Sequence, residues 1–187
     1  MSAVSIEESV VSGDNYVETL SSIAPFQGLP EAVLSILCEH SERRTYSAGQ
    51  TVFSLGQYDG GEFLVVLSGV LRVSVTDGST GAMLIEDVRE NEIFGLEIAI
   101  SEADPSSFQQ IAVNAAEDTD VVVMDAAEFR SLAGGRPSLM RNTAIYLAEQ
   151  LSAFRLQAKT AEAAPEQRVY AALLKCISRD PVARLRC

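Results

Sequence analysis

Residues 46–75 read YSAGQTVFSLGQYDGGEFLVVLSGVLRVSV, in which short β-rich runs alternate with glycine-containing turns. Valine, leucine and phenylalanine dominate the runs TVFSL, EFLVVLSG and VLRVSV, and such residues fit the pleated, half-buried surface of a sheet. The sequence Asp-Gly-Gly and the single glycines between them mark turns. This stretch therefore predicts the first strands of a β domain.

The same spacing continues as far as Asp125. Three further runs, AMLIEDV, IAVNA and DVVVMD, are separated by polar turns such as RENE and AAEDT. The segment TDGSTG at 76–81 has two glycines and Asp77, which predicts a hairpin turn. Short strands at regular spacing are typical of a barrel or sandwich, and we expect a double-sheet jelly roll.

Helical patterns precede the β region. Residues 1–14 are polar and acidic and predict a disordered segment, whereas residues 15–24 predict a short helix. Pro30 suits the first turn of a second helix, and Glu31 favours its positive end. We expect this helix to end near residues 38–41.

Two more helices are predicted after the β region. Asp125 can cap a helix that begins with AAEFRSLA, and the sequence GGRP then breaks the chain. A longer helix is expected to begin near Pro137. A further helix, PEQRVYAALLKCISRD, is expected after Pro165 and is too short to enclose a core of its own.

The long helix carries an apolar seam with heptad spacing. Its members recur at alternating intervals of four and three residues: Met140, Ala144, Leu147, Leu151, Phe154, Ala158 and Ala161. This pattern is typical of a helix that pairs with its own copy. Packing on its own barrel is the alternative. We favour a homodimer, because a helix leaving a compact β domain has little else against which to bury the stripe.

The charge of the chain is strongly acidic. It has 187 residues, 14 basic and 26 acidic, with a net charge of −12. This composition argues against a chain-wide surface for nucleic acid or acidic membranes, which needs clustered Lys and Arg. Residues 161–187 have five basic and three acidic groups, a net charge of +2, so residues 1–160 carry −14. The shift in charge marks a candidate domain boundary.

Candidate metal and catalytic residues are few. Cys38, Cys176 and Cys187 lack metal-site spacing, and His40, the single histidine, is interpreted as a solvated residue at a helix end. One histidine cannot supply a nucleophile-base constellation, so we expect no enzyme, no metal and no certain cofactor. No signal peptide or membrane-length apolar run occurs, and a cytoplasmic protein without a membrane partner is expected.

The run at 46–75 resembles the first half of a cyclic nucleotide-binding domain. NEIFG at 91–95, with AVNA further on, resembles its phosphate-binding cassette and the following strand. Asn91 stands where the family has glycine, and Asn tolerates the left-handed conformation that a turn there needs. The other matching positions are Gly49, Phe53, Gly56, Asp59, Leu64, Val65, Val66, Gly69 and Val73.

The later helices extend the resemblance to Crp/Fnr-type transcription regulators. The long helix resembles their dimerisation helix, and RVYAALL resembles the first helix of their winged helix-turn-helix. The expected fold is mainly β with α: a jelly-roll effector domain, a long dimerisation helix and the start of a truncated DNA-binding domain. The expected boundaries are 1–14 disordered, 15–136 effector domain, 137–163 dimerisation helix and 164–187 DNA-binding start.

The cassette departs from the family pattern at its charged positions. In the family, Phe-Gly-Glu begins the cassette and Arg-Ser/Thr-Ala ends it. Here Leu96 follows Gly95 and the carboxylate of Glu97 comes one place late, while two neutral amides replace the arginine and its hydroxyl partner. The candidate ligand-binding residues are Phe94, Gly95, Leu96, Glu97, Gln109 and Gln110.

Three interpretations of this pocket remain open: retuned to another small molecule, vestigial, or an unmodified cyclic-nucleotide site. The leading functional hypothesis is the effector-sensing domain of a Crp/Fnr-type regulator, acting as a homodimer. Its effector is a cyclic nucleotide or another metabolite, and DNA is a partner only if a full helix-turn-helix is present. The alternative is a stand-alone dimeric interaction module with a vestigial pocket and no DNA binding.

Overall fold

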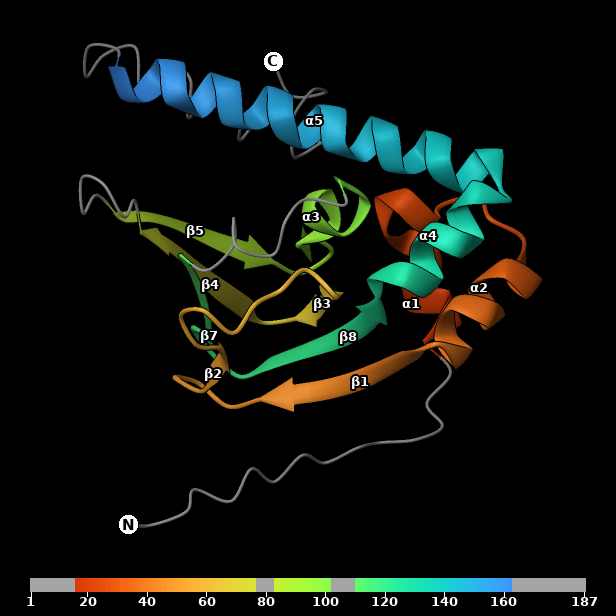
Figure 1. Ribbon diagram of the computed structural model, residues 1–187, viewed down its shortest axis with the longest axis horizontal. Coiled ribbons are helices and arrows are strands. Elements are labelled where there is room, and N and C mark those ends of the chain that lie inside the picture. The colour runs from red at the N-terminus through yellow and green to blue at the C-terminus, as the bar shows by residue number, and fades with distance from the viewer. Residues whose placement is uncertain (1–15, 77–82, 102–109, 163–187) are drawn as a thin grey trace, which may run out of the picture. The chain divides into compact units, whose positions relative to one another are not determined.

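The computed structural model describes residues 16–76, 83–101 and 110–162 (Figure 1). The chain divides into two compact units, Met1–Thr143 and Ala144–Cys187, and their boundary falls within the last helix. The hairpin turn predicted at 76–81 and the helix predicted after Pro165 lie outside the described residues, apart from Thr76 at the end of a strand.

The first two helices lie where the sequence predicts them, but the first one is shorter than predicted. The helix predicted at 15–24 is α1 (Val17–Ser22), and a 3-10 turn, η1 (Ala24–Phe26), follows it. Helix α2 (Glu31–Glu39) begins after Pro30 as predicted. It buries Val33, Leu34 and Leu37, which lie on one face because they are spaced by one and three residues.

Two four-stranded antiparallel sheets form the body of the first unit. The first sheet has the order β1-β8-β3-β6 and the second has the order β2-β7-β4-β5. The predicted double-sheet architecture is confirmed. The strands are β1 (Ser41–Tyr46), β2 (Thr51–Phe53), β3 (Glu62–Ser68), β4 (Val70–Thr76), β5 (Met83–Arg89), β6 (Ile93–Phe94), β7 (Ile111–Ala115) and β8 (Thr119–Asp125).

Strand β1 has no counterpart among the runs predicted from the sequence. It reads SERRTY, which has little apolar character, yet it pairs in register with β8 along its whole length. Asp120 on β8 accepts hydrogen bonds from Arg43 and Thr45, both at 2.5 Å. The strand therefore forms because its polar side chains meet partners from a segment 75 residues or more away, which local pattern does not reveal.

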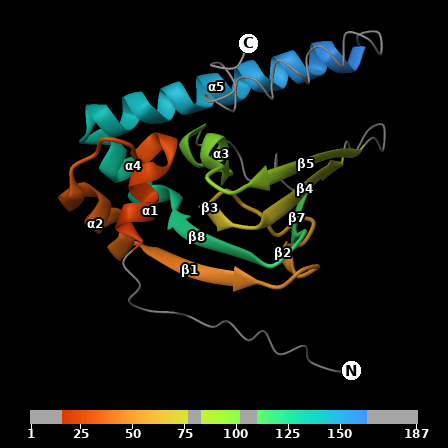
Figure 2. The same ribbon diagram turned by 180° about the vertical axis from the view of Figure 1, so that it is seen from behind.

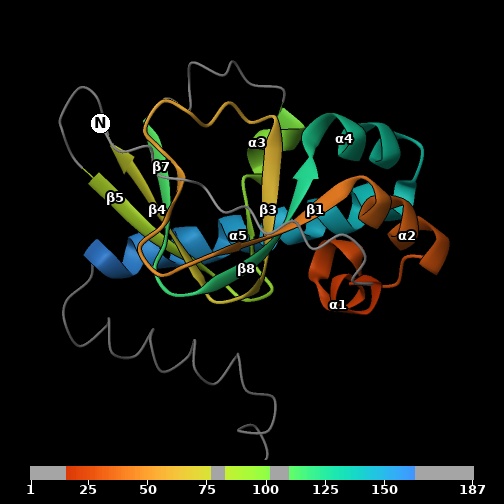
Figure 3. The same ribbon diagram turned by 90° about the horizontal axis from the view of Figure 1, so that it is seen from below.

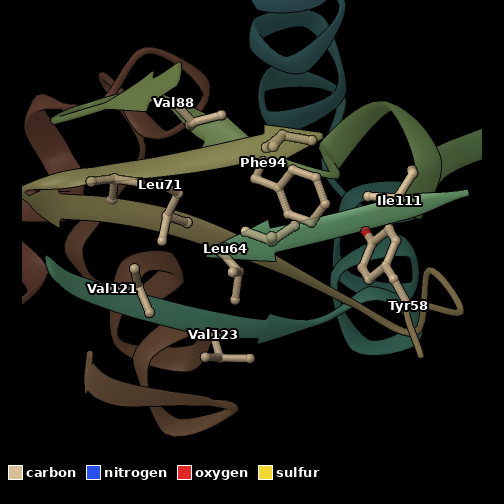
Figure 4. Close-up of a cluster of buried hydrophobic side chains, with 11 residues drawn as sticks. Tyr58, Leu64, Leu71, Val88, Phe94, Ile111, Val121 and Val123 are labelled. Atoms are coloured by element: carbon tan, nitrogen blue, oxygen red, sulfur yellow. The ribbon is translucent and has the colours of Figure 1, made fainter. Parts of the chain in front are cut away.

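Apolar side chains from both sheets fill the space between them (Figure 4). Three aromatic rings meet near the end of this core: Tyr58 lies 4.9 Å from both Phe53 and Phe94, measured between ring centroids. The cluster consists of Tyr58, Leu64, Val66, Leu71, Val73, Val88, Phe94, Ile111, Val113, Val121 and Val123.

The helices α1, α2 and α4 gather at one end of the sheets (Figure 2). Helix α4 (Ala126–Gly134) begins at Asp125, whose side chain accepts a hydrogen bond from the Glu128 amide at 2.8 Å, so the predicted cap is confirmed. Phe129 on α4 makes edge-to-face contacts with Phe26 and Phe63. These rings hold α4 against the first sheet.

Helix α5 (Pro137–Glu162) begins at the predicted proline. Within the first unit, Asn142 donates a hydrogen bond to the carbonyl of Gln27 at 2.8 Å, and the buried Thr143 hydroxyl donates to Leu139. None of the described helices has the length and apolar character needed to cross a membrane.

Candidate functional site

The candidate site begins with two left-handed turns that flank β6. Asn91 has a φ of 65° and Gly95 a φ of +83°. The sequence-based expectation that Asn91 adopts the left-handed conformation is therefore confirmed. The amide of Asn91 donates to Val66 and the amide of Val66 donates to Glu92, which ties the first turn to β3.

Gly95 fits closely over a tyrosine from another segment. A Cβ atom on Gly95 would stand 2.1 Å from the phenol oxygen of Tyr58, well inside contact distance. Tyr58 is almost fully buried and donates a hydrogen bond to the carbonyl of Glu62 at 3.0 Å. Glycine is thus required at position 95 both by its backbone conformation and by the space that Tyr58 occupies.

The cassette continues into α3 (Leu96–Ser101), which lies beside α4 (Figure 3). Leu96 and Ala99 are fully buried. The amide of Ala99 donates to Gly95 at 2.8 Å, and its carbonyl accepts a hydrogen bond from the guanidinium of Arg130 on α4. The short helix is therefore held at its first turn by Gly95 and at its far end by Arg130.

Glu97, by contrast with Leu96 and Ala99, is exposed to solvent. Protein still surrounds its carboxyl group densely enough that burial, with a further contribution from Glu86, raises its pKa. Burial likewise raises the pKa of Tyr58, and the negative charge of Glu97 adds to that effect. Water reaches the Glu97 side chain, so the energetic effect is smaller than for an enclosed carboxyl group.

The predicted ligand-binding residues have different surroundings. Phe94 and Leu96 are buried in packing contacts, and Glu97 is exposed. Gln110 is an exposed residue just before β7, and its carbonyl accepts a hydrogen bond from the Thr76 amide at 3.0 Å. Gln109 lies outside the described residues. The fold places Phe94 to Glu97 in one turn.

Sequence reasoning misses two residues that shape the cassette. Tyr58 lies in the glycine-containing turn GQYDGG, and the sequence pattern gives Arg130 no role. An aromatic residue between two turn glycines is a weak signal for a buried ring. No local pattern indicates that Arg130 reaches α3, because the contact joins residues 31 positions apart.

A separate hollow of about 580 Å³ lies near the starts of β1 and β3. Arg44 sits among its carboxylates, 2.8 Å from Glu42 and 3.7 Å from Glu62. Burial raises the pKa of Glu62, and Arg44 acts against that increase. The carboxylates Glu42 and Glu62 already have an arginine partner, and this hollow is not among the sequence-predicted sites.

The histidine and cysteine of the described residues form no second candidate site. His40 is exposed and forms the C-cap of α2. Cys38 is half-buried, and burial raises the pKa of its thiol to about 11, so the thiol stays protonated at neutral pH. Among residues 16–76, 83–101 and 110–162, no group of three or more His, Cys, Asp and Glu side chains is arranged to hold a metal ion.

Comparison with known proteins assigns the class of domain. Residues 43–135 match the family model of the cyclic nucleotide-binding domain. The match begins in β1 and extends one residue beyond α4, so it contains both sheets and the cassette. This part of the chain is a domain of the cyclic nucleotide-binding type.

Solved structures of similar fold include regulators and one enzyme. The catabolite activator protein of Thermus thermophilus is 23% identical, with a TM-score of 0.58 over 74% of this chain and 63% of that chain. The sensor domain of the transcriptional regulator DNR from Pseudomonas aeruginosa is 16% identical, with a TM-score of 0.60 over 72% and 92%. A cAMP-binding acyltransferase from Mycobacterium smegmatis is 21% identical, with a TM-score of 0.58 over 74% and 41%. The present chain therefore spans less than two thirds of the Thermus protein.

Proposed function

We propose that this chain is the effector-sensing part of a Crp/Fnr-type transcription regulator whose effector is bound without the usual arginine. The supporting observation is a cassette whose frame is present and whose chemistry is altered. Gly95 has the left-handed turn and α3 follows it, but the buried side chain at the first position of α3 is Leu96. A leucine cannot accept a hydrogen bond from a ribose hydroxyl.

The proposed ligand chemistry follows from the residues that remain. Gln109 and Gln110 stand at the positions of the family arginine and its hydroxyl partner, and amides offer neutral donors and acceptors without the guanidinium charge. Glu97 adds a carboxylate with a raised pKa. These residues favour a small metabolite with hydrogen-bond donors over a ligand whose binding depends on an anionic phosphate.

We extend the proposal to the long helix as the dimerisation element, residues 137–163. Met140 and Leu151, two members of the predicted seam, are 43% and 49% exposed in the single chain, and Ala144 is exposed as well. Leu147 is partly exposed, and the side chains of Phe154 and Ala158 lie outside the described residues. A partner helix would bury these apolar surfaces. Effector binding would then bias how the two helices pair.

We also propose that the chain continues into a DNA-binding domain of this regulator class. Residues 164–187 are proposed as the start of a winged helix-turn-helix, and DNA recognition would need the recognition helix that follows in such domains. The regulator class is supported by the similarity to a transcriptional sensor domain and to a catabolite activator protein. We propose ligand binding and not catalysis as the activity of the described residues.

A second candidate is a dimeric interaction module with a vestigial pocket. The observation in its favour is that eleven buried side chains fill the space between the two sheets, where Tyr58 and Phe94 pack against each other (Figure 4). A domain whose interior is filled in this way can act as a scaffold without an effector. The two candidates differ in whether any small molecule binds.

A calorimetric titration of the purified chain with cyclic AMP and cyclic GMP tests the proposal. We expect no heat of binding at micromolar ligand. Micromolar affinity would show that the unmodified nucleotide mechanism holds and would overturn the retuned cassette. A subsequent screen of uncharged and amine-containing metabolites by thermal shift separates the two candidates, because a stabilising ligand supports a sensor and its consistent absence supports the scaffold.

A further inference from the structure

The end of helix α3 is held by a side chain from α4. The guanidinium of Arg130 donates from Nη1 to the carbonyl of Ala99. Ala99 lies in the last turn of α3, where carbonyl groups lack the acceptor role that they have inside a longer helix. A charged donor at this end also suits the direction of the peptide dipoles.

Arg130 extends from helix α4, which is held in place by packing and by its N-terminal cap. Phe129, the neighbouring residue, packs edge-to-face against Phe26 of η1 and Phe63 of β3. Asp125 caps the start of the same helix. Arg130 is partly buried, and its guanidinium therefore extends from a rigid helix to the end of a helix of only six residues.

The opposite end of α3 has a fixed position of its own. The amide of Ala99 is bonded to the carbonyl of Gly95, and Gly95 is fitted against the Tyr58 phenol. Ala99 thus receives one contact from each side, from Gly95 through its amide and from Arg130 through its carbonyl. A helix of six residues is too short to be stable by its own hydrogen bonds, so these outside contacts decide its position.

We propose that Arg130 is a positioning residue that fixes the cassette helix α3 and so determines how Glu97 is presented to a ligand. The importance of this role rests on the proposed function, because only a ligand-binding cassette needs a defined α3. The positioning itself is a property of the free protein. It can be measured whether or not any nucleotide binds.

The test is amide hydrogen exchange of the whole chain, measured by NMR without ligand. Arg130→Met removes the guanidinium and keeps most of the apolar stem. A charge-assisted hydrogen bond contributes enough that exchange of the Ala99 amide should accelerate about tenfold to a hundredfold, while amides of β3 and β8 keep their rates. Arg130→Lys keeps a charged donor and should restore at least part of the protection.

A matched control is Arg136→Met. Arg136 lies two residues beyond α4, and no hydrogen bond joins its side chain to α3 among the described residues. Arg136→Met makes the same chemical change, and it should leave the exchange rate of the Ala99 amide as it is in the parent protein. If Arg130→Met does not fold, Arg130→Leu, which also lacks a hydrogen-bond donor, replaces it in the same comparison.

Three outcomes would overturn the proposal. They are an unchanged Ala99 rate in Arg130→Met, an equal acceleration in β3 and β8, and no recovery in Arg130→Lys. The second would mean that Arg130 stabilises the whole domain and not α3. The nucleotide titration and the metabolite screen test the proposed function separately, so a failure of one conclusion can be told apart from a failure of the other.

Discussion

The phenol oxygen of Tyr58 occupies the space that a side chain on Gly95 would need, with only 2.1 Å between that oxygen and the position of a Cβ atom. The two residues belong to different segments, the turn between β2 and β3 and the junction of β6 and α3. Their fit fixes where the cassette begins. It also explains why the left-handed turn at Gly95 is accompanied by a fully buried tyrosine.

Gly95→Ala should destabilise the protein by about 2–5 kcal/mol. A non-glycine residue in the left-handed region costs about 1–2 kcal/mol, and overpacking against Tyr58 adds about 1–3 kcal/mol. Urea unfolding measures the change. Gly49→Ala is the matched control, because Gly49 has a φ of +82° with nothing within 4 Å of its Cβ position, so it isolates the backbone contribution.

The double variant Gly95→Ala with Tyr58→Phe should recover part of that loss. Removing the hydroxyl leaves Cζ as the nearest atom, at 3.2 Å from the position that a Cβ atom of residue 95 would take. Tyr58→Phe alone loses one hydrogen bond to Glu62, a cost of about 1 kcal/mol. Simple additivity of the two substitutions would argue against direct contact between these residues.

Glu97→Gln should stabilise the protein slightly at neutral pH and leave it unchanged in acid. Burial and Glu86 raise the pKa of Glu97 in the folded state. The stability linked to this group is therefore present below the pKa of an unfolded glutamate, about 4.3, and is lost as the pH rises through the folded value. Thermal unfolding at pH 7 and pH 3 measures both limits, with Glu90→Gln in an exposed turn as control. A loss of stability at pH 7 would contradict the assigned environment.

Asp120→Asn should cost about 1 kcal/mol at neutral pH by weakening the pairing of β1 with β8. Burial alone would raise the pKa of Asp120, but hydrogen bonds from Thr45 and Arg43 outweigh burial and lower it. Its contribution is thus present above the unfolded aspartate pKa and is lost as the pH falls through the lower folded value. Denaturant unfolding at pH 7 and at pH 2.5 to 3 measures the difference, with Glu117→Gln as the exposed control. An equal cost at both pH values would exclude the charge as the cause.

Leu151→Glu and Phe154→Glu should each convert a dimer to a monomer. A twofold seam would bring each introduced carboxylate close to its own copy, and buried like charges are strongly unfavourable. Light scattering at tens of micromolar measures the mass. Gln150→Glu, one residue off the seam, should leave the dimer intact. A parent protein that is already monomeric, or a dimer that both variants retain, would remove the seam assignment.

Gln109→Arg should improve the affinity for cyclic AMP about tenfold to a hundredfold, because a guanidinium restores charge-assisted hydrogen bonds to the phosphate. Calorimetry measures the gain against the parent chain. Gln110→Arg places the same charge one position later and should give less. Equal or absent gains in both variants would mean that Gln109 does not stand at the position of the family arginine.

Several features of this chain follow from local rules. The alternation of β-rich runs with glycine turns predicts six of the eight strands in the described residues, Asp125 predicts the start of α4, and the side chain of Asn91 favours its left-handed conformation. Each of these depends on the residue itself and its immediate neighbours. Propensity, capping and turn chemistry act over a few residues, so they can be inferred without the fold.

Contacts between distant segments needed the tertiary structure. Strand β1 forms through Asp120, Gly95 is constrained by Tyr58, and α3 is held by Arg130. In each case the free energy comes from a partner that is close only after the chain has folded. The amino-acid pattern therefore specified the two-sheet architecture and the altered cassette chemistry, whereas the folded arrangement decided which residues hold the cassette in place.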